Sequence, residues 1–418
     1  MTNLKIKDNS VHKIHQFPNG LRLIYQHHPS NIAHFGIHIN AGTRDESANI
    51  MGMAHFIEHM LFKGTQKRRA LQIISRLEEV GGEMNAYTTK DKTTLYASFI
   101  DGYLPRAVDL LTDAAFHSNF PEKEMEKEKN VILEEIDMYA DNPEECVNDE
   151  FQELMFKNHP LGYNILGTQD TVKSLTREQS IGFIAANYLP HNIVYAYVGN
   201  SSIEKVIGLC EKYMPTIQNG TKPNKREAFK NYVPFTTVKE TEHAQCYCVM
   251  GNLSYNNSHP LKPALALLCN LLGGPGLNSR LNLAVRERYG YAYQIDSSFS
   301  TYEDTGYFSI YFGTDPKYLD KTMKLVEAEL KRLQKEALSE TVLNKYKRQM
   351  EGQMLLAEES KVSLMLSLGK SLLDYNKVDT LEEVIQKIYA VTPAQILQVA
   401  REVFDESQTS RLIYKSKA

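Results

Sequence analysis

The chain has 418 residues and a formal net charge of −4, from 47 basic and 51 acidic side chains. The length predicts two to four domains of ordinary size, and the near-balanced charge gives no electrostatic basis for binding nucleic acid or an anionic membrane surface. No stretch reaches the roughly 18 apolar residues of a membrane span, and the five cysteines are too scattered for a disulfide framework. The first ten residues contain no apolar segment typical of a secretory signal. We therefore expect a cytoplasmic protein.

The first predicted elements are strands. Residues 13–26 read as a strand hairpin around Pro18-Asn19-Gly20, and Asn-Gly is a strong signal for a hairpin turn. Residues 33–40 also alternate, so His34 and His38 lie on one face of a predicted strand. Nothing nearby in the sequence supplies further metal ligands, and we interpret both as ordinary strand residues.

A short apolar helix is predicted over residues 50–62. Its apolar run is interrupted by His55, Glu58 and His59, which lie side by side on one helical face because they are spaced i, i+3 and i+4. Buried imidazoles and a buried carboxylate are costly unless a partner satisfies them. The alternatives are two core histidines packed beside a salt-bridged glutamate, or a divalent metal. We favour zinc, because His at i and i+4 can reach one ion and the inverted His-x-x-Glu-His spacing is a zinc-peptidase pattern.

Further elements follow this helix. Residues 71–80 predict an amphipathic helix closed by Gly81-Gly82, and residues 83–100 predict one or two strands around a turn near Lys90-Asp91. A helix is expected over residues 104–117, and Pro121 then starts a long acidic helix that closes before Pro143.

Most glutamates of that acidic helix are expected to face solvent. Glu128 and Glu135 are seven residues apart and share a face. Glu134 and Glu135 interrupt an apolar run, so at least one of them points inward and needs a cation. The residues alone leave open which one does.

The chain then divides near its middle. Thr176 and Gln179 form a capping-box pattern before a helix and the strand over residues 193–199. The polar, Pro- and Gly-bearing stretch that follows reads as a linker. We expect an N-terminal domain over residues 1–217, a linker over 218–230 and a C-terminal domain over 231–418.

The two halves share sequence anchors. Tyr103 and Tyr318 lie 215 residues apart in similar strand-to-helix contexts, and the capping-box pattern at Thr176 recurs 216 residues later at Thr392. Two anchors at one offset favour a duplicated α+β unit of about 200 residues over coincidence. The His-x-x-Glu-His pattern does not recur, so the chemistry is expected in the first copy.

Three features of the second half have simple interpretations. Cys246 and Cys248 alternate on a predicted strand and read as buried thiols rather than a metal pair. The glycine-rich stretch over residues 271–280 indicates a flexible loop or a close backbone approach, and it lacks the Gly-Lys-Ser/Thr of a phosphate loop. From the residues alone, Arg286 reads as a surface arginine near a helix end.

These motifs resemble the pitrilysin family of zinc peptidases, the M16 or inverzincin group that includes insulin-degrading enzyme and the mitochondrial processing peptidases. The resemblance runs along the whole chain. His55-Phe-Ile-Glu-His59, with Leu-Phe-Lys-Gly-Thr after Met60, resembles the family's zinc helix. The segment from Glu128 to Glu135 resembles the part that supplies the third zinc ligand.

The resemblance implies a role for particular residues. His55, His59 and Glu135 are implied to bind one zinc ion per chain, with Glu128 in support and Glu58 as the base that takes a proton from a water and passes it to the leaving amine. The segment around Met84-Asn-Ala-Tyr-Thr resembles the edge strand that pairs with extended substrate. The residues implied to bind peptide there are Asn85, Ala86, Tyr87 and Thr88.

Arg286 and Tyr293 fall where the family has an Arg/Tyr pair contributed by the second domain, which would stabilise the oxyanion and hold the substrate backbone. The resemblance also implies the fold: two homologous α+β domains, each a mainly antiparallel sheet with helices on one side, in a clam-like dimer. A homodimer is expected, and a heterodimer with a related chain is the alternative.

The implied function is a zinc metalloendopeptidase or oligopeptidase that acts on unfolded peptides. Nucleic acid and membrane are not expected partners. The competing class is a non-catalytic assembly or partner-recognition subunit, since some relatives of this fold serve that role. Such chains typically lose motif residues, whereas all of them stand here.

Overall fold

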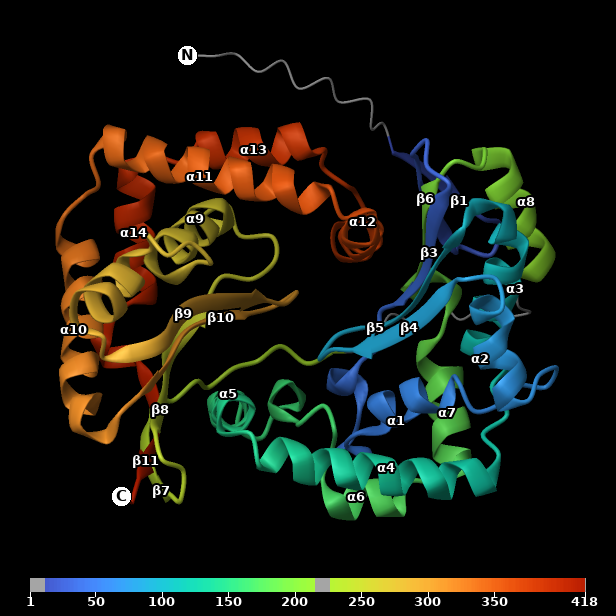
Figure 1. The fold of residues 1–418 in the computed structure, drawn as a ribbon, viewed down its shortest axis with the longest axis horizontal. Helices are drawn as coiled ribbons and strands as arrows, with labels where there is room; N and C mark the ends of the chain where they lie inside the picture. Colours follow the sequence, from blue (N-terminus) through green and yellow to red (C-terminus); the bar gives the residue numbers. More distant parts are fainter. Residues whose placement is uncertain (1–11, 215–225, 418) are drawn as a thin grey trace. The chain divides into compact units, whose positions relative to one another are not determined.

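The computed structural model describes residues 12–214 and 226–417, and the chain divides into two compact units (Figure 1). The first unit comprises Met1–Asp137, Tyr163–Arg226 and Leu356–Glu382. The second comprises Met138–Gly162, Glu227–Leu355 and Glu383–Ala418. Each unit is organised around its own sheet with helices packed on it, so the predicted two-domain α+β fold is confirmed.

The sheet of the first unit has six strands in the order β1-β2-β6-β3-β5-β4. All neighbours are antiparallel except β2 and β6, which are parallel. The predicted hairpin turns at Gly20, whose φ of 94° suits glycine. The strands are β1 (Lys13–Gln16), β2 (Arg22–His27), β3 (Ile32–Ile39), β4 (Glu83–Thr88), β5 (Thr93–Ile100) and β6 (Ile193–Gly199).

The sheet of the second unit has five strands in the order β7-β11-β8-β10-β9, with β7 and β11 parallel and the other pairs antiparallel. Cys246 and Cys248 both lie on β8 and are buried, as predicted. The strands are β7 (Thr236–Thr241), β8 (Cys246–Ser254), β9 (Ala292–Thr301), β10 (Gly306–Thr314) and β11 (Ser410–Ser416).

The two sheets share one connectivity. In each, the last strand of the unit lies between the first long strand and the second, parallel to the former and antiparallel to the latter. The predicted anchors also coincide: helices begin directly after Tyr103 and Tyr318, and Thr176 and Thr392 both cap helices through a capping box. The duplication inferred from the sequence is therefore present in the fold.

The helices follow the same repeat. Those of the first half are α1 (Met53–Met60), α2 (Ala70–Glu78), α3 (Leu104–His117), α4 (Glu122–Ala140), α5 (Pro143–Met155), α6 (Gln169–Ser174), α7 (Arg177–Asn187) and α8 (Ile203–Tyr213). Those of the second half are α9 (Lys262–Gly273), α10 (Leu319–Lys335), α11 (Glu340–Glu358), α12 (Lys361–Tyr375), α13 (Leu381–Tyr389) and α14 (Pro393–Val403), with a π-helical turn over Asn282–Glu287.

One helix is exchanged in each direction between the sequence halves. Each is the helix that follows the long helix of its repeat. Helix α5 packs on β8 and β11 of the second unit, where Val147 and Phe151 are fully or almost fully buried. Helix α12 packs on β3 and β6 of the first unit, where Met365 and Leu372 are buried. Each sheet therefore carries a helix on the face opposite its main core, a layer that the sequence did not predict.

The expected domain limits of 1–217 and 231–418 treat each domain as one continuous stretch, whereas the helix exchange makes the compact units discontinuous in sequence. The expected linker covers residues 218–230, of which 218–225 lie outside the described residues. Near its end, Arg226 is the last residue of the first unit, and its side chain is only 7% exposed.

The glycine-rich stretch shows one of its two expected forms, a close backbone approach. A Cβ atom on Gly273 would lie 2.5 Å from the backbone nitrogen of Ser297, and one on Gly274 would lie 2.5 Å from the carbonyl oxygen of Asn270. Only glycine fits at both positions.

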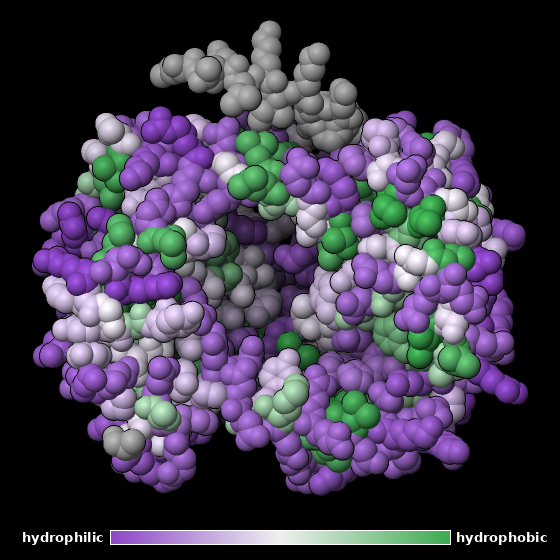
Figure 2. All heavy atoms as spheres, in the orientation of Figure 1, coloured by the Kyte–Doolittle hydropathy of each residue, from purple (hydrophilic) through white to green (hydrophobic). Residues whose placement is uncertain are grey.

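The visible surface is largely polar. Figure 2 shows hydrophilic residues over most of the face in view, with apolar residues scattered among them. Across the described residues, every helix is too short or too polar to cross a lipid bilayer.

Candidate metal centre

The helix that carries the predicted metal ligands is α1 (Met53–Met60). Its N-cap is Gly52, whose φ is 89° and whose position leaves no room for a side chain, since a Cβ atom would lie 2.6 Å from the carbonyl oxygen of Leu166. The apolar side chains of the helix enter the main core of the first unit. Packing against that core fixes the polar stripe of His55, Glu58 and His59 in one orientation.

The imidazoles of His55 and His59 on α1 converge with the carboxylate of Glu135 on α4. Nε2 of His55 lies 3.8 Å from Oε2 of Glu135, and Nε2 of His59 lies 3.6 Å from the same oxygen. Their ligand atoms all lie within 4.8 Å of one another. Among the described residues, these three form the only group of histidine, cysteine or acidic side chains found close enough to share a metal ion.

This donor set fits zinc. Two imidazole nitrogens and one carboxylate are a common catalytic zinc set, and tetrahedral bonds of about 2.1 Å place ligand atoms about 3.4 Å apart. The observed separations of 3.6 and 3.8 Å are slightly longer. Small side-chain shifts would close the set around an ion and leave one coordination position open.

Burial also favours the ligand form of His55. Burial, with a smaller contribution from neighbouring His59, lowers the pKa of His55 to about 3. The ring is therefore neutral at ordinary pH, and a neutral imidazole is the form that binds a metal. Its Nδ1 is buried, and no described residue supplies a hydrogen-bond partner for it.

Glu128 supports the second histidine. Its Oε2 lies 3.1 Å from Nδ1 of His59, and its Oε1 lies 2.6 Å from Nζ of Lys63. Burial opposes ionisation of Glu128, but the hydrogen bonds and charges of His59 and Lys63 outweigh it and hold its pKa below the usual range. An ionised acceptor at Nδ1 directs Nε2 of His59 toward Glu135, the arrangement typical of metal-bound histidine. Lys63 was not singled out in the sequence.

The structure also separates the two adjacent glutamates of α4. Glu134 is exposed, whereas the side chain of Glu135 is 24% exposed and faces the histidines. Met125, Glu128 and Ile132 are buried on the same helix. Glu135 continues this buried face at helical spacing.

Glu58 lies on α1 between the two histidines and is held from the neighbouring strand. The hydroxyl of Thr88 donates a hydrogen bond of 2.6 Å to Oε2 of Glu58. The pKa of Glu58 lies above its usual range, because burial outweighs the bond from Thr88 and the charge of His59, which lower it. The contact leaves the other carboxylate oxygen free of a described hydrogen bond.

The predicted peptide-binding residues lie on an edge strand. Strand β4 contains Asn85, Ala86, Tyr87 and Thr88, pairs with β5, and is the last strand of its sheet. Among the described residues, no strand pairs with the other side of β4, and such an edge can accept an extended peptide by main-chain hydrogen bonds.

Arg286 and Tyr293 contact each other in the second unit. Arg286 lies in the π-helical turn and Tyr293 on β9, the edge strand of that sheet. The guanidinium carbon of Arg286 lies 5.4 Å from the ring centroid of Tyr293, which is 82% exposed. The pair is thus an accessible cation–π contact. Its role toward the metal centre stays a prediction.

The repeat-related helices of the second unit hold a different contact. Helices α9 and α11 correspond to α1 and α4, and there Nδ2 of Asn270 donates a hydrogen bond of 2.7 Å to Oε1 of Gln353. Neutral amides thus join these helices where the first unit has histidine and glutamate.

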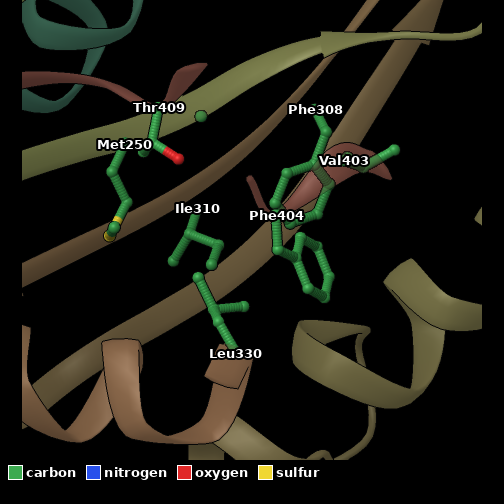
Figure 3. A pocket seen from close by; sticks show the side chains of 8 residues that line it. Met250, Phe308, Ile310, Leu330, Val403, Phe404 and Thr409 are labelled. Atoms are coloured by element: carbon green, nitrogen blue, oxygen red, sulfur yellow. The ribbon is translucent and has the colours of Figure 1, made fainter. Parts of the chain in front are cut away.

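The second unit also contains an apolar pocket, with Met250, Phe308, Ile310 and Leu330 among its lining side chains (Figure 3). It offers no set of metal ligands.

Comparison with known proteins assigns the family. The family model described as Insulinase (Peptidase family M16) matches residues 22–169, and the model described as Peptidase M16 inactive domain matches residues 174–350. A protein of Bacillus subtilis called an uncharacterized zinc protease is 35% identical over 401 residues, which is 95% of this chain and 97% of that protein. This chain belongs to peptidase family M16.

Other M16 relatives agree. An uncharacterized zinc protease of Mycobacterium leprae is 32% identical over 407 residues, covering 96% of this chain and 91% of the relative. The names of these M16 relatives support a zinc metallopeptidase.

Solved structures share the M16 fold. A protease from Helicobacter pylori superposes with a TM-score of 0.88 at 22% identity, covering 97% of this chain and 99% of that chain. A Pseudomonas fluorescens structure described as a peptidase M16 inactive domain gives a TM-score of 0.90 at 20% identity, covering 97% and 98%. At these identities the likeness concerns the fold alone.

Proposed function

We propose that this chain is a zinc-dependent endopeptidase or oligopeptidase that hydrolyses unfolded peptides. The observation that carries the proposal is the convergence of His55, His59 and Glu135 beside Glu58, with ligand atoms within 4.8 Å of one another. Family membership and the names of the relatives support the same reading.

The residues divide into holding and reacting groups. His55, His59 and Glu135 would hold one zinc ion, and Glu128 would orient His59 through its bond to Nδ1. When bound, zinc supplies a Lewis acid and lowers the pKa of an attacking water. Glu58 would accept the proton of that water and return it to the leaving amine. Thr88 would keep the Glu58 carboxylate turned toward the reacting atoms.

Substrate would be held by its backbone. A peptide added along the open edge of β4, at Asn85–Thr88, gains main-chain hydrogen bonds whatever its side chains are. Such binding requires an extended segment, which a folded protein does not offer. This is why unfolded peptides are the proposed substrates.

Arg286 and Tyr293 would assist from the second unit of a partner copy in a clam-like homodimer. Both side chains can donate hydrogen bonds, and Tyr293 is exposed enough to meet a substrate carbonyl. The homodimer, the alternative heterodimer and the cytoplasmic location are further predictions of this proposal.

A non-catalytic subunit of the same fold is the alternative, and the matched model for the second half describes an inactive domain. The presence of Glu58 with all three ligand residues opposes that alternative for the first half. The deciding experiment measures zinc content of the purified protein and hydrolysis of an unstructured fluorogenic peptide. We expect one zinc per chain, loss of hydrolysis on chelation and recovery on adding zinc. A zinc-free protein, or a zinc-loaded protein that cleaves no unfolded peptide, would contradict the proposal.

A further inference from the structure

The helix that carries His55 is capped by a side chain from an earlier loop. Both oxygens of Glu46 accept backbone N–H groups at the start of α1: Oε2 from Gly52 at 2.8 Å and Oε1 from Ala54 at 2.7 Å. Gly52 has no side chain to cap these groups itself, and Glu46 is only 4% exposed. Ala54 directly precedes His55, so Glu46 fixes the backbone next to a metal ligand.

The residue beside Glu46 is held by an arginine far away in the sequence. Asp45 accepts two bonds from the guanidinium of Arg226, 3.0 Å from Nε and 2.7 Å from Nη2. The Asp45 side chain is 4% exposed and that of Arg226 is 7% exposed. This bidentate geometry is specific to arginine and defines the position of the carboxylate in two directions.

Arg226 makes further contacts around the same loop. Its Nη1 donates to Oδ1 of Asn40 at 3.1 Å, and its Nη2 donates to the carbonyl oxygen of Asp91 at 2.8 Å. Asn40 directly follows β3, and Asp91 lies in the turn between β4 and β5. A single side chain therefore ties the loop before α1 to the sheet behind it.

Arg226 is also the last residue of the first unit, since the second unit resumes at Glu227. The segment that connects the sequence halves therefore meets the first unit, which carries the candidate metal centre, at a buried ionic contact. Nothing in the proposed reaction requires this arginine, and the contact serves the position of the loop.

We propose that Arg226 is a positioning residue of the metal centre, which acts through Asp45 and Glu46 to fix the N-terminus of α1 and hence His55. The inference rests on the proposed zinc site. Without Arg226, the buried carboxylate of Asp45 loses both guanidinium bonds, and its loop would shift to solvate it. Glu46 moves with that loop because the two residues are adjacent. The cap of α1 then loosens, and the zinc ligands lose part of their preorganisation.

The test measures zinc affinity of the full chain by competition with a chromogenic chelator. Arg226→Met keeps the length of the side chain but removes its charge and donors, and we expect affinity to fall about tenfold, the lower end of effects for residues behind metal ligands. The zinc affinity of Arg226→Lys should lie between those of wild type and Arg226→Met, because an ammonium keeps the charge but lacks the two-pronged geometry of the guanidinium.

The matched control is Arg22→Met. Arg22 is also a multiply bonded arginine of the first unit, but it bonds to Asn376 and to the carbonyl oxygens of His191 and Leu372. It should keep wild-type zinc affinity.

Two further measurements separate positioning from general destabilisation. In a double-mutant cycle, Arg226→Met and Asp45→Asn should be non-additive in zinc affinity, because both act on one contact. Hydrogen exchange of the metal-free protein should show faster exchange of the Ala54 amide in Arg226→Met than in Arg22→Met.

The outcomes distinguish this inference from the proposed function. If the wild type binds no zinc, the proposed function fails and the inference falls with it. If the wild type binds zinc and Arg226→Met binds it equally well, or if the Ala54 amide stays protected, only the role of Arg226 is overturned.

Discussion

Oε2 of Glu128 lies 3.1 Å from Nδ1 of His59. The same ring presents Nε2 to Glu135 at 3.6 Å, so the two glutamates of α4 approach opposite nitrogens of one imidazole. Lys63 helps to keep Glu128 ionised, so the carboxylate is a hydrogen-bond acceptor at Nδ1 of His59. We expect Glu128 to orient His59 as a metal ligand.

Glu128→Gln should weaken zinc binding by about 10- to 100-fold without abolishing it, the usual effect of losing a carboxylate behind a ligating histidine. Chelator competition measures the change. Glu126→Gln is the control on the same helix, because the Glu126 side chain is 71% exposed and pairs with Lys129. Equal affinity of both variants would remove Glu128 from the metal centre.

Glu135→Gln should lose the metal, because an amide oxygen is a much weaker zinc ligand than a carboxylate. Zinc content after dialysis, measured by atomic absorption, is the readout. The adjacent Glu134→Gln is the matched control, since Glu134 is exposed and should leave zinc content unchanged. Full zinc in Glu135→Gln would point to Glu128 or Glu134 as the third ligand.

Part of this centre was predictable from residue spacing. His55, Glu58 and His59 share a face on any helix, so the sequence was sufficient to group them. The choice between Glu134 and Glu135 rested on the family resemblance, although a local signal existed. Glu135 continues the face of Met125, Glu128 and Ile132 at helical spacing, and those three residues are buried.

Other features carried no local signal. The apolar faces of α5 and α12 predict burial, but an apolar face does not specify which of two similar sheets it covers. The exchange of these helices therefore appeared only in the fold. The bonds from Glu46 to the start of α1 and from Arg226 to Asp45 join residues that lie apart in sequence, and no spacing rule connects them.

Glu58→Gln should keep zinc and lose hydrolysis by about 10²- to 10⁴-fold or more, because an amide cannot accept the proton of the attacking water. Zinc content and turnover of a fluorogenic peptide are measured on the same sample. Normal zinc with undiminished hydrolysis would exclude Glu58 as the base. Loss of zinc would instead give Glu58 a structural role at the centre.

Acid should destabilise the first unit partly through His38. This residue is 1% exposed on β3, beneath α12, where a Cβ atom on Gly369 would lie 2.2 Å from its ring. Burial lowers the pKa of His38 to about 3; nearby Lys92 also lowers it and Asp374 raises it. Lys92 and Asp374 pair with each other at 2.6 Å, so burial dominates.

The folded state then binds fewer protons at His38 than the unfolded state between pH about 3 and about 6.5. Neutral His38 contributes fully to the free energy of unfolding above the pKa of the unfolded state, and this contribution is lost as the pH falls below that pKa. Between about pH 7 and about pH 5 the free energy of unfolding should fall by about 2 kcal/mol through His38. Urea unfolding at both pH values should show a steeper decrease for wild type than for His38→Gln. Parallel decreases would mean that His38 titrates normally in the folded protein.

Mixing two inactive variants tests whether one active site draws on two chains. One variant is Glu58→Gln, with an intact second unit, and the other is Arg286→Ala/Tyr293→Phe, with an intact first unit. In a homodimer whose sites each combine the first unit of one chain with the second unit of the other, random exchange makes about half of the dimers mixed. Each mixed dimer contains one site with all its residues, so activity should recover to about a quarter of the wild-type value per chain. Each variant incubated alone is the control and should stay inactive. A mixture that also stays inactive, although labelled chains are seen to exchange, would place Arg286 and Tyr293 in the same site as Glu58 of their own chain. Activity of the Arg286→Ala/Tyr293→Phe variant on its own would instead place the pair outside the reaction.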